Sequence, residues 1–187
     1  VCWGGSNPYG ETTVPALSNP TQVSVGRLHS CALDDTGVVC WGYQAPSEFI
    51  LGSPTEVSTG SHHTCALNSV ALLCLLHGSA ADHGQATVPT LSNPTQVSAG
   101  ANHTCALHDN GVSCWGLNGS GQTTVPALSN PTQVRAGESA TCAFDDTGMV
   151  CWGNTSTHTL LFDADGDGLT AQGQSVQGHA CCTSGRD

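Results

Sequence analysis

Charge is scarce in this 187-residue sequence, and lysine is missing from it altogether. Only 9% of the residues are charged, and 14 acidic residues face three arginines, which gives a formal net charge of −11. Nucleic-acid binding needs a basic patch that neutralises phosphates, and this composition cannot supply one. Apolar runs are also short, because the longest, residues 70–76, is far below the ~20 residues of a membrane-spanning helix. We therefore expect no nucleic-acid partner and no membrane span.

Catalytic motifs are lacking as well. The sequence shows no nucleophile elbow, no phosphate-binding loop and no zinc-hydrolase motif, and its histidines and aspartates follow a repeat. Its first residues, VCWG, do not form a signal peptide, so we interpret the chain as a mature form or a fragment. We expect a protein that is not an enzyme.

Cysteine, in contrast, is abundant, with 11 residues. This content is typical of secreted proteins held together by disulfides, and it predicts an extracellular location. A separation of nine residues recurs in four pairs: Cys31–Cys40, Cys65–Cys74, Cys105–Cys114 and Cys142–Cys151. A spacing used four times indicates a repeat, and its unit is about 37 residues long. The units of this single repeat domain, residues 1–187, start near Cys2, Cys40, Cys74, Cys114 and Cys151.

Short β-strands and tight turns are predicted within each unit. Residues 21–26, TQVSVG, alternate polar and apolar side chains, as a half-buried strand does. Two β-rich runs flank residues 34–37, DDTG, and this turn places Cys31 opposite Cys40, within reach of a disulfide. We therefore predict a cross-strand disulfide in each pair. Free buried thiols are one alternative, and zinc ligation is a weaker one, because zinc fingers space their cysteines two to four residues apart. The predicted class is all-β.

Three stretches of the repeat resemble a known family. They are CWGLNGSGQ (114–122), QVSAGANHTCAL (96–107) and DDTGVVCWG (34–42). These stretches look like repeats of the regulator-of-chromosome-condensation type, in a short, cysteine-bearing, secreted or bacterial form. The resemblance implies a β-propeller-like array of about five ~37-residue blades of short antiparallel strands, whereas members of the family usually have about seven. Family functions range from nucleotide exchange and chromatin binding to inhibition of β-lactamases, so function must be argued from sites.

The two ends of the chain complement each other within the repeat. Cys2 corresponds to the second cysteine of a pair, whereas Cys181, in the context Gly-His-Ala-Cys, corresponds to a first cysteine. We predict a Cys2–Cys181 disulfide, with Cys182 as the alternative partner. Within one chain this bond would close a propeller. Between chains it would propagate as a ring or a head-to-tail fibre.

Two other residue types recur with the repeat. Histidine stands two residues before the first cysteine at His29, His63, His103 and His179, and Ala140 breaks this series. Tryptophan follows the second cysteine at Trp3, Trp41, Trp115 and Trp152, and Leu75 breaks that series. We interpret the histidines as framework groups that bond a neighbouring backbone carbonyl, rather than as a ring of metal ligands. The tryptophans are expected to pack between blades rather than to form a sugar platform.

An acidic segment, residues 160–175, carries the clearest sign of a ligand. Asp163, Asp165 and Asp167 precede a glycine in the order of the first half of a calcium-binding loop. Position 12 of that loop is Gln174 instead of the glutamate of an EF-hand, and no flanking helices are predicted. We predict a Ca2+ site, with a plain acidic turn as the alternative.

Three Asn-X-Ser/Thr sequons begin at Asn102, Asn118 and Asn154, all in expected turns. A turn can accommodate a glycan, although such triplets also arise by chance in a sequence rich in serine and threonine. We retain the three asparagines as candidate glycosylation sites.

These features together favour a non-enzymatic extracellular scaffold with a structural or adhesive role. Its complementary ends would assemble it head-to-tail into a fibre. The alternative is a closed propeller, a binding module that captures a partner protein. The expected partner is accordingly either a second copy of the chain or an unknown protein.

Overall fold

The computed structural model describes residues 1–2, 7–46, 49–78 and 82–155. These residues form twelve short strands in four antiparallel sheets of three, which confirms the all-β class. The strands are β1 (Gln22–Val25), β2 (His29–Asp34), β3 (Gly37–Gly42), β4 (Glu56–Thr59), β5 (His63–Leu67), β6 (Leu72–Leu76), β7 (Gln96–Ala99), β8 (His103–His108), β9 (Gly111–Gly116), β10 (Gln133–Ala136), β11 (Ala140–Asp145) and β12 (Gly148–Gly153). Among the described residues there is no helix that could cross a membrane.

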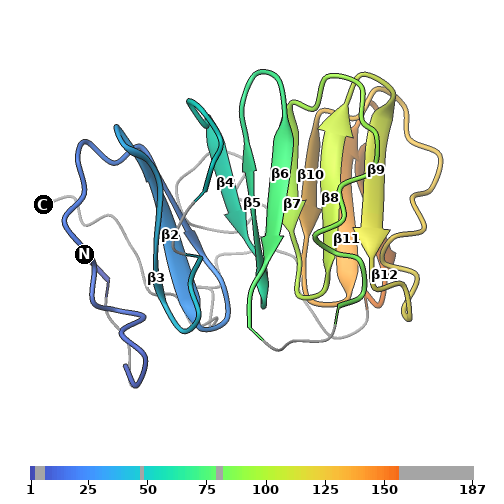
Figure 1. Ribbon diagram of the computed structural model, residues 1–187. Helices are drawn as coiled ribbons and strands as arrows, with labels where there is room; N and C mark the ends of the chain where they lie inside the picture. The colour runs from blue at the N-terminus through green and yellow to red at the C-terminus, as the bar shows by residue number, and fades with distance from the viewer. Residues whose placement is uncertain (3–6, 47–48, 79–81, 156–187) are drawn as a thin grey trace, which may run out of the picture.

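Each sheet is one blade of a propeller-like array. The four-residue strands β1, β4, β7 and β10 are the inner strands, and successive inner strands contact one another. The blades follow in chain order from β1–β3, in blue, to β10–β12, in orange (Figure 1). Each described blade contains one complete cysteine pair, so the predicted antiparallel blades are confirmed. Most of the unit that starts at Cys151 lies outside the described residues.

The four predicted hairpin disulfides are present. Cys31 pairs with Cys40 in the register of β2 and β3, and their Cα atoms are 4.0 Å apart. The other three pairs occupy the same place in their blades, with Cα–Cα distances of 4.0–4.1 Å. The turn itself is tighter than the predicted four-residue loop, because Asp34 pairs with Gly37 and leaves two residues between them. Gly37 permits this turn with a φ of 121°.

Proline-bearing crossings that lead into the blades are held by acidic turns. The backbone N–H of Ser18 donates to Asp34 Oδ2 at 2.9 Å, and Asn19 Nδ2 donates to Asp35 Oδ2. Hydrogen bonds from Thr36 and Ser18 hold the pKa of Asp34 below its ordinary value. The last described blade repeats both contacts from Ser129 and Asn130 to Asp145 and Asp146. Some of the acidic residues of the chain therefore stabilise the fold.

The apolar core lies in the contacts between blades, which we call seams. Cys31 and Leu33 of the first blade form one buried cluster with Val57 of the second. Cys65 of the second blade belongs to a cluster that includes Val97 of the third. A single blade is too small to bury a core by itself, so the blades depend on their neighbours for stability.

Candidate functional site

Inner strands are joined across each seam by side chains that bond the backbone of the next blade. Gln22 Oε1 accepts the N–H of Val57 at 2.8 Å, and Ser24 Oγ accepts the N–H of Thr59 at 3.0 Å. The second and third seams repeat this pattern: Glu56 to Val97 at 3.0 Å, Ser58 to Ala99 at 2.9 Å, Gln96 to Val134 at 2.8 Å and Ser98 to Ala136 at 2.9 Å. The sequence analysis did not predict this role. Its only indication was the polar residues within the inner-strand segments TQVS and TEVS.

The recurring histidines also cross the seams. Their Nε2 atoms bond threonine hydroxyls of the next blade: His29 to Thr64 at 2.9 Å, His63 to Thr104 at 2.8 Å and His103 to Thr141 at 2.9 Å. All three rings are buried, with exposed fractions of 0–2%. The framework role is therefore confirmed, but the partner differs from the backbone carbonyl that the sequence suggested.

Hydrogen bonds to the threonines fix which ring nitrogen carries the proton. Thr104 Oγ1 donates to the carbonyl of Gln85 at 2.8 Å, so its oxygen accepts from His63 Nε2–H. The same arrangement joins His103, Thr141 and the carbonyl of Gln122. Burial lowers the pKa of His63 and of His103 to about 4, so both rings are neutral at physiological pH.

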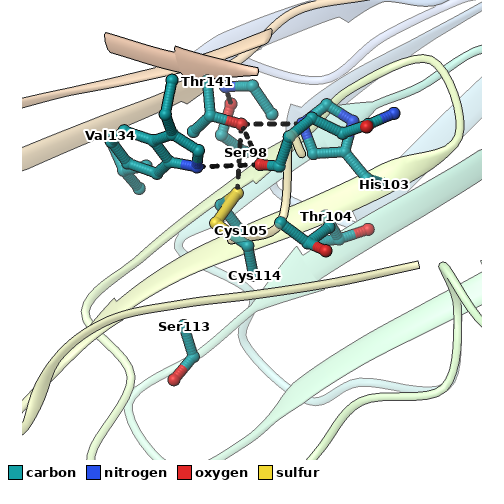
Figure 2. Close-up of a disulfide and its surroundings, with 12 residues drawn as sticks. Ser98, His103, Thr104, Cys105, Ser113, Cys114, Val134 and Thr141 are labelled. Atoms are coloured by element: carbon teal, nitrogen blue, oxygen red, sulfur yellow. Dashed lines mark hydrogen bonds between the residues drawn. A yellow bond between two sulfur atoms is a disulfide. The ribbon is translucent and has the colours of Figure 1, made fainter. Parts of the chain in front are cut away.

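Each histidine ring packs on the glycine that precedes it by three residues. A Cβ added to Gly100 would lie 2.5 Å from the carbonyl oxygen of Gly137 and 2.5 Å from His103 Cε1. Both distances are too short for any side chain. Glycine, histidine and the disulfide therefore form one packed unit, and Figure 2 shows His103, Thr141 and Cys105 meeting in the third seam.

The described tryptophans are framework residues, of which Trp41 and Trp152 are buried and Trp115 is half-buried. Trp115 Nε1 donates to the carbonyl of Gln85 at 3.0 Å, and Trp152 Nε1 donates to that of Gln122 at 2.9 Å. Trp115 also packs on the cluster that joins the second and third blades. Trp41 and Trp152 are each only 8% exposed. Packing between blades is confirmed for Trp115. The burial of Trp41 and Trp152 leaves no open ring faces for a sugar platform at those two positions.

A polar depression lies where the turns between inner and middle strands meet. These turns, residues 26–28, 60–62, 100–102 and 137–139, are here called the inner turns, and they line most of a hollow of about 680 Å³. Their glycines recur in every blade, but the next position differs each time: Arg27, Ser61, Ala101 and Glu138. A constant frame thus presents a variable set of side chains.

Among the described residues, no group of three or more His, Cys, Asp or Glu could hold a metal ion. The calcium-type residues Asp163, Asp165 and Asp167 lie outside the described residues, so the Ca2+ site stays a prediction. Trp3 and His179 also lie outside the described residues, so their framework roles stay predictions.

Cys2 is disulfide-bonded. Its expected partners, Cys181 and Cys182, both lie outside the described residues, so the predicted pairing stays a prediction.

The three sequons stand in different surroundings. Asn118 organises its loop, because its Oδ1 accepts the N–H of Thr123 at 3.0 Å and its Nδ2 donates to Thr124. Asn102 lies in an inner turn, and its sequon ends at the buried Thr104. Asn154 is exposed. None of these contacts tests glycosylation, which stays a prediction.

The seams and blades define a disulfide-stapled repeat array of the β-propeller type. A profile of the Regulator of chromosome condensation (RCC1) repeat matches residues 21–45 and 95–122. The two matched segments are therefore similar to RCC1 repeats, as the sequence resemblance indicated, and each contains cysteines of a hairpin pair. A search of curated proteins finds no match.

Solved structures with the same architecture include two plant receptor ectodomains. The ectodomain of the Physcomitrella patens receptor kinase CR4 is 29% identical, with a TM-score of 0.68 over 81% of this chain and 46% of that one. The CRINKLY WD40 ectodomain of Arabidopsis thaliana ACR4 is 25% identical, with a TM-score of 0.60 over 72% and 52%. Prp20p from Saccharomyces cerevisiae, at 17% identity and a TM-score of 0.59 over 82% and 49%, shares the fold alone. The chain spans about half the length of these structures.

Proposed function

We propose that this chain is an extracellular, non-enzymatic binding module, which holds a partner protein over the depression between the inner turns. The observation that carries this proposal is the contrast between the side chains that join the blades and the side chains that line the depression, which we call the rim. Histidine, threonine and cysteine recur at the seams, whereas the residues that face the depression change from blade to blade. Variable turns on a constant scaffold are typical of binding sites, because loops can differ while the scaffold positions them.

Chemical variety at the rim suits a polar protein surface. Arg27 and Glu138 bring opposite charges, and Ser61, His62 and Asn102 add groups that form hydrogen bonds. Four disulfides and the likeness to two receptor ectodomains support an extracellular location.

The fibre alternative depends on the last unit of the chain, most of which lies outside the described residues, so it stays a prediction. The last described blade does not supply such a contact by itself. Each seam takes a serine and a histidine from the preceding blade, and the last described blade has Arg135 and Ala140 at these two positions.

An immobilised sample screened against an array of extracellular proteins tests the proposal. Ser61→Arg and Ala101→Arg place a large cation at turn positions that accept arginine in the first blade, where Arg27 stands. Val70→Arg is the matched control, because Val70 lies in the hairpin turn at the far end of β5 and is 83% exposed. Proteins captured by the wild type and the control, but not by the rim variants, support the depression as the binding site. An array without captured proteins, or capture that all variants retain, contradicts it.

A further inference from the structure

The first seam, between β1–β3 and β4–β6, differs from the other two in what its threonine bonds. The threonines of the second and third seams donate their hydroxyl protons to backbone carbonyls. In the first seam, Thr64 Oγ1 lies 2.9 Å from His29 Nε2 and 3.1 Å from His77 Nε2. A second imidazole ring therefore takes the place that a backbone carbonyl has in the other seams.

The sequence accounts for this exchange. The carbonyls of the other two seams belong to Gly-Gln pairs at residues 84–85 and 121–122, in the crossings that precede the third and fourth blades. The crossing that precedes the second blade, residues 43–55, contains no Gly-Gln pair. His77 directly follows β6 of the second blade, and its backbone N–H donates to the carbonyl of His62 at 3.0 Å. This bond helps to hold the His77 ring beside Thr64.

Thr64 can serve both rings in this way only while at least one of them is neutral. Its hydroxyl has one proton, so the ring that receives this proton must present an Nε2 atom without a hydrogen. The other ring donates its own Nε2–H to the hydroxyl oxygen. A protonated histidine carries hydrogens on both nitrogens and cannot accept. Two protonated rings would also repel each other, because the ring centroids of His29 and His77 are only 4.3 Å apart.

The surroundings of the two rings supply further basic groups. Burial lowers the pKa of His29 to about 3 and that of His77 to about 4, and neighbouring histidines of the second blade add to both shifts. These neighbours include His62 in the inner turn and His63 on β5. The other charged or titratable side chains of the adjoining elements are Arg27 in the inner turn of the first blade, Asp34 at the hairpin end of β2, Tyr43 after β3 and Glu56 on β4. Among the described residues, no carboxylate acts on either ring to offset a gained proton.

We propose that the first seam opens in acid: when His29 and His77 become protonated, the bonds at Thr64 break and β1–β3 separates from β4–β6, while the second and third seams stay closed at the same pH. Arg27 and Ser61 line the depression on either side of this seam. Opening it therefore widens the rim between the first two blades. Release of a bound partner in acid would follow, and this consequence alone rests on the proposed function.

Backbone amides whose hydrogen bonds cross a seam report its opening. They are Val57 and Thr59 for the first seam, Val97 and Ala99 for the second, and Val134 and Ala136 for the third. Hydrogen exchange of the oxidised protein, resolved by residue with NMR, gives the protection of each amide relative to an unstructured peptide at the same pH. Measurements at about pH 7.5 and about pH 5 then compare the three seams within one molecule.

The number of histidines released sets the expected size of the effect. A histidine whose pKa is 6.5 when exposed and about 4 when buried makes opening about 30-fold more favourable at pH 5 than at pH 7.5. The second and third seams each release one such ring, of His63 and of His103. The first seam releases two rings, of which His77 is half-buried, so we expect its amides to lose at least about tenfold more protection than those of the other seams. An equal or smaller loss in the first seam overturns the proposal.

A substitution at His77 tests whether the second imidazole is the cause. His77→Gln keeps an oxygen that can accept the Thr64 proton but cannot become charged, so the extra loss at Val57 and Thr59 should disappear. His108→Gln is the matched control, because His108 bonds Ser113 within the third blade, and it should behave like the wild type. Extra loss that survives His77→Gln, or that His108→Gln also removes, contradicts the proposal. No partner protein enters these measurements, so this proposal and the proposed binding face fail separately.

Discussion

Thr104→Val removes one buried hydroxyl from the middle of the array and keeps the shape of the side chain. The hydroxyl oxygen accepts from His63 Nε2 at 2.8 Å, and its proton goes to the carbonyl of Gln85 at 2.8 Å. The carbonyl keeps its second donor, Trp115 Nε1. The N–H of His63 is left buried without a partner, which costs about 1–3 kcal/mol. We expect the free energy of unfolding to fall by about 2 kcal/mol, which is about 4–8 °C in melting temperature for a domain of this size.

Urea unfolding of the oxidised protein, followed by tryptophan fluorescence, measures this loss. Thr95→Val is the matched control in the same blade, because Thr95 is exposed and its hydroxyl reaches the carbonyl of Leu107 only at 3.4 Å. The control should change the free energy of unfolding by no more than about 0.5 kcal/mol. Equal effects of the two substitutions would refute the view that histidine–threonine bonds hold the blades together.

Three further outcomes are expected. Burial lowers the pKa of His63 and of His103 from 6.5 to about 4, so between these pH values the unfolded chain binds more protons than the folded chain. The contribution of these histidines to the free energy of unfolding is therefore constant above pH 6.5 and falls as the pH drops below it. His103→Gln should flatten that slope in acid titrations. Burial also raises the pKa of Glu56, so Glu56→Gln should raise the melting temperature at pH 7, and less at pH 4; a lower melting temperature would contradict this. Because Cys151 is exposed and Cys74 is only 7% exposed, limited reduction with alkylation should open Cys142–Cys151 before Cys65–Cys74.

The blades and their disulfides could be predicted because the information is local. Cys31 and Cys40 are nine positions apart, and a glycine such as Gly37 favours a tight turn between them. Antiparallel pairing across that turn then leaves one register in which the cysteines face each other. Four copies of the same spacing made the inference robust, even where the turn was longer, as between Leu67 and Leu72.

The seam contacts could not be predicted in the same way, because they join residues 35 to 41 positions apart in different blades. Periodicity shows that His63 and Thr104 are framework residues, but not which faces of two blades meet. Local reasoning therefore assigned the histidines to a backbone carbonyl. One usable signal was present in the sequence: Ala140 and Ala180 replace a histidine and the hydroxyl expected in the following unit. Such joint loss indicates a contact between units.

Scarcity of charge is itself a consequence of how the blades are joined. Every described seam is closed by neutral hydroxyl, amide and imidazole groups that bond backbone or one another, apart from Glu56. A buried charge at these positions must be desolvated without a fully compensating partner, and the raised pKa of Glu56 reports that cost. Repetition multiplies the constraint, because each blade has one face toward either neighbour. Apart from Glu56 and Arg135, the described charged side chains lie in turns and loops or at the strand ends beside them, where Arg27 and Glu138 stand at the depression and Asp34 holds its crossing. The exclusion of charge from the seams thus accounts for the low content of charged residues, and it leaves the side chains at the rim of the depression free to differ between blades.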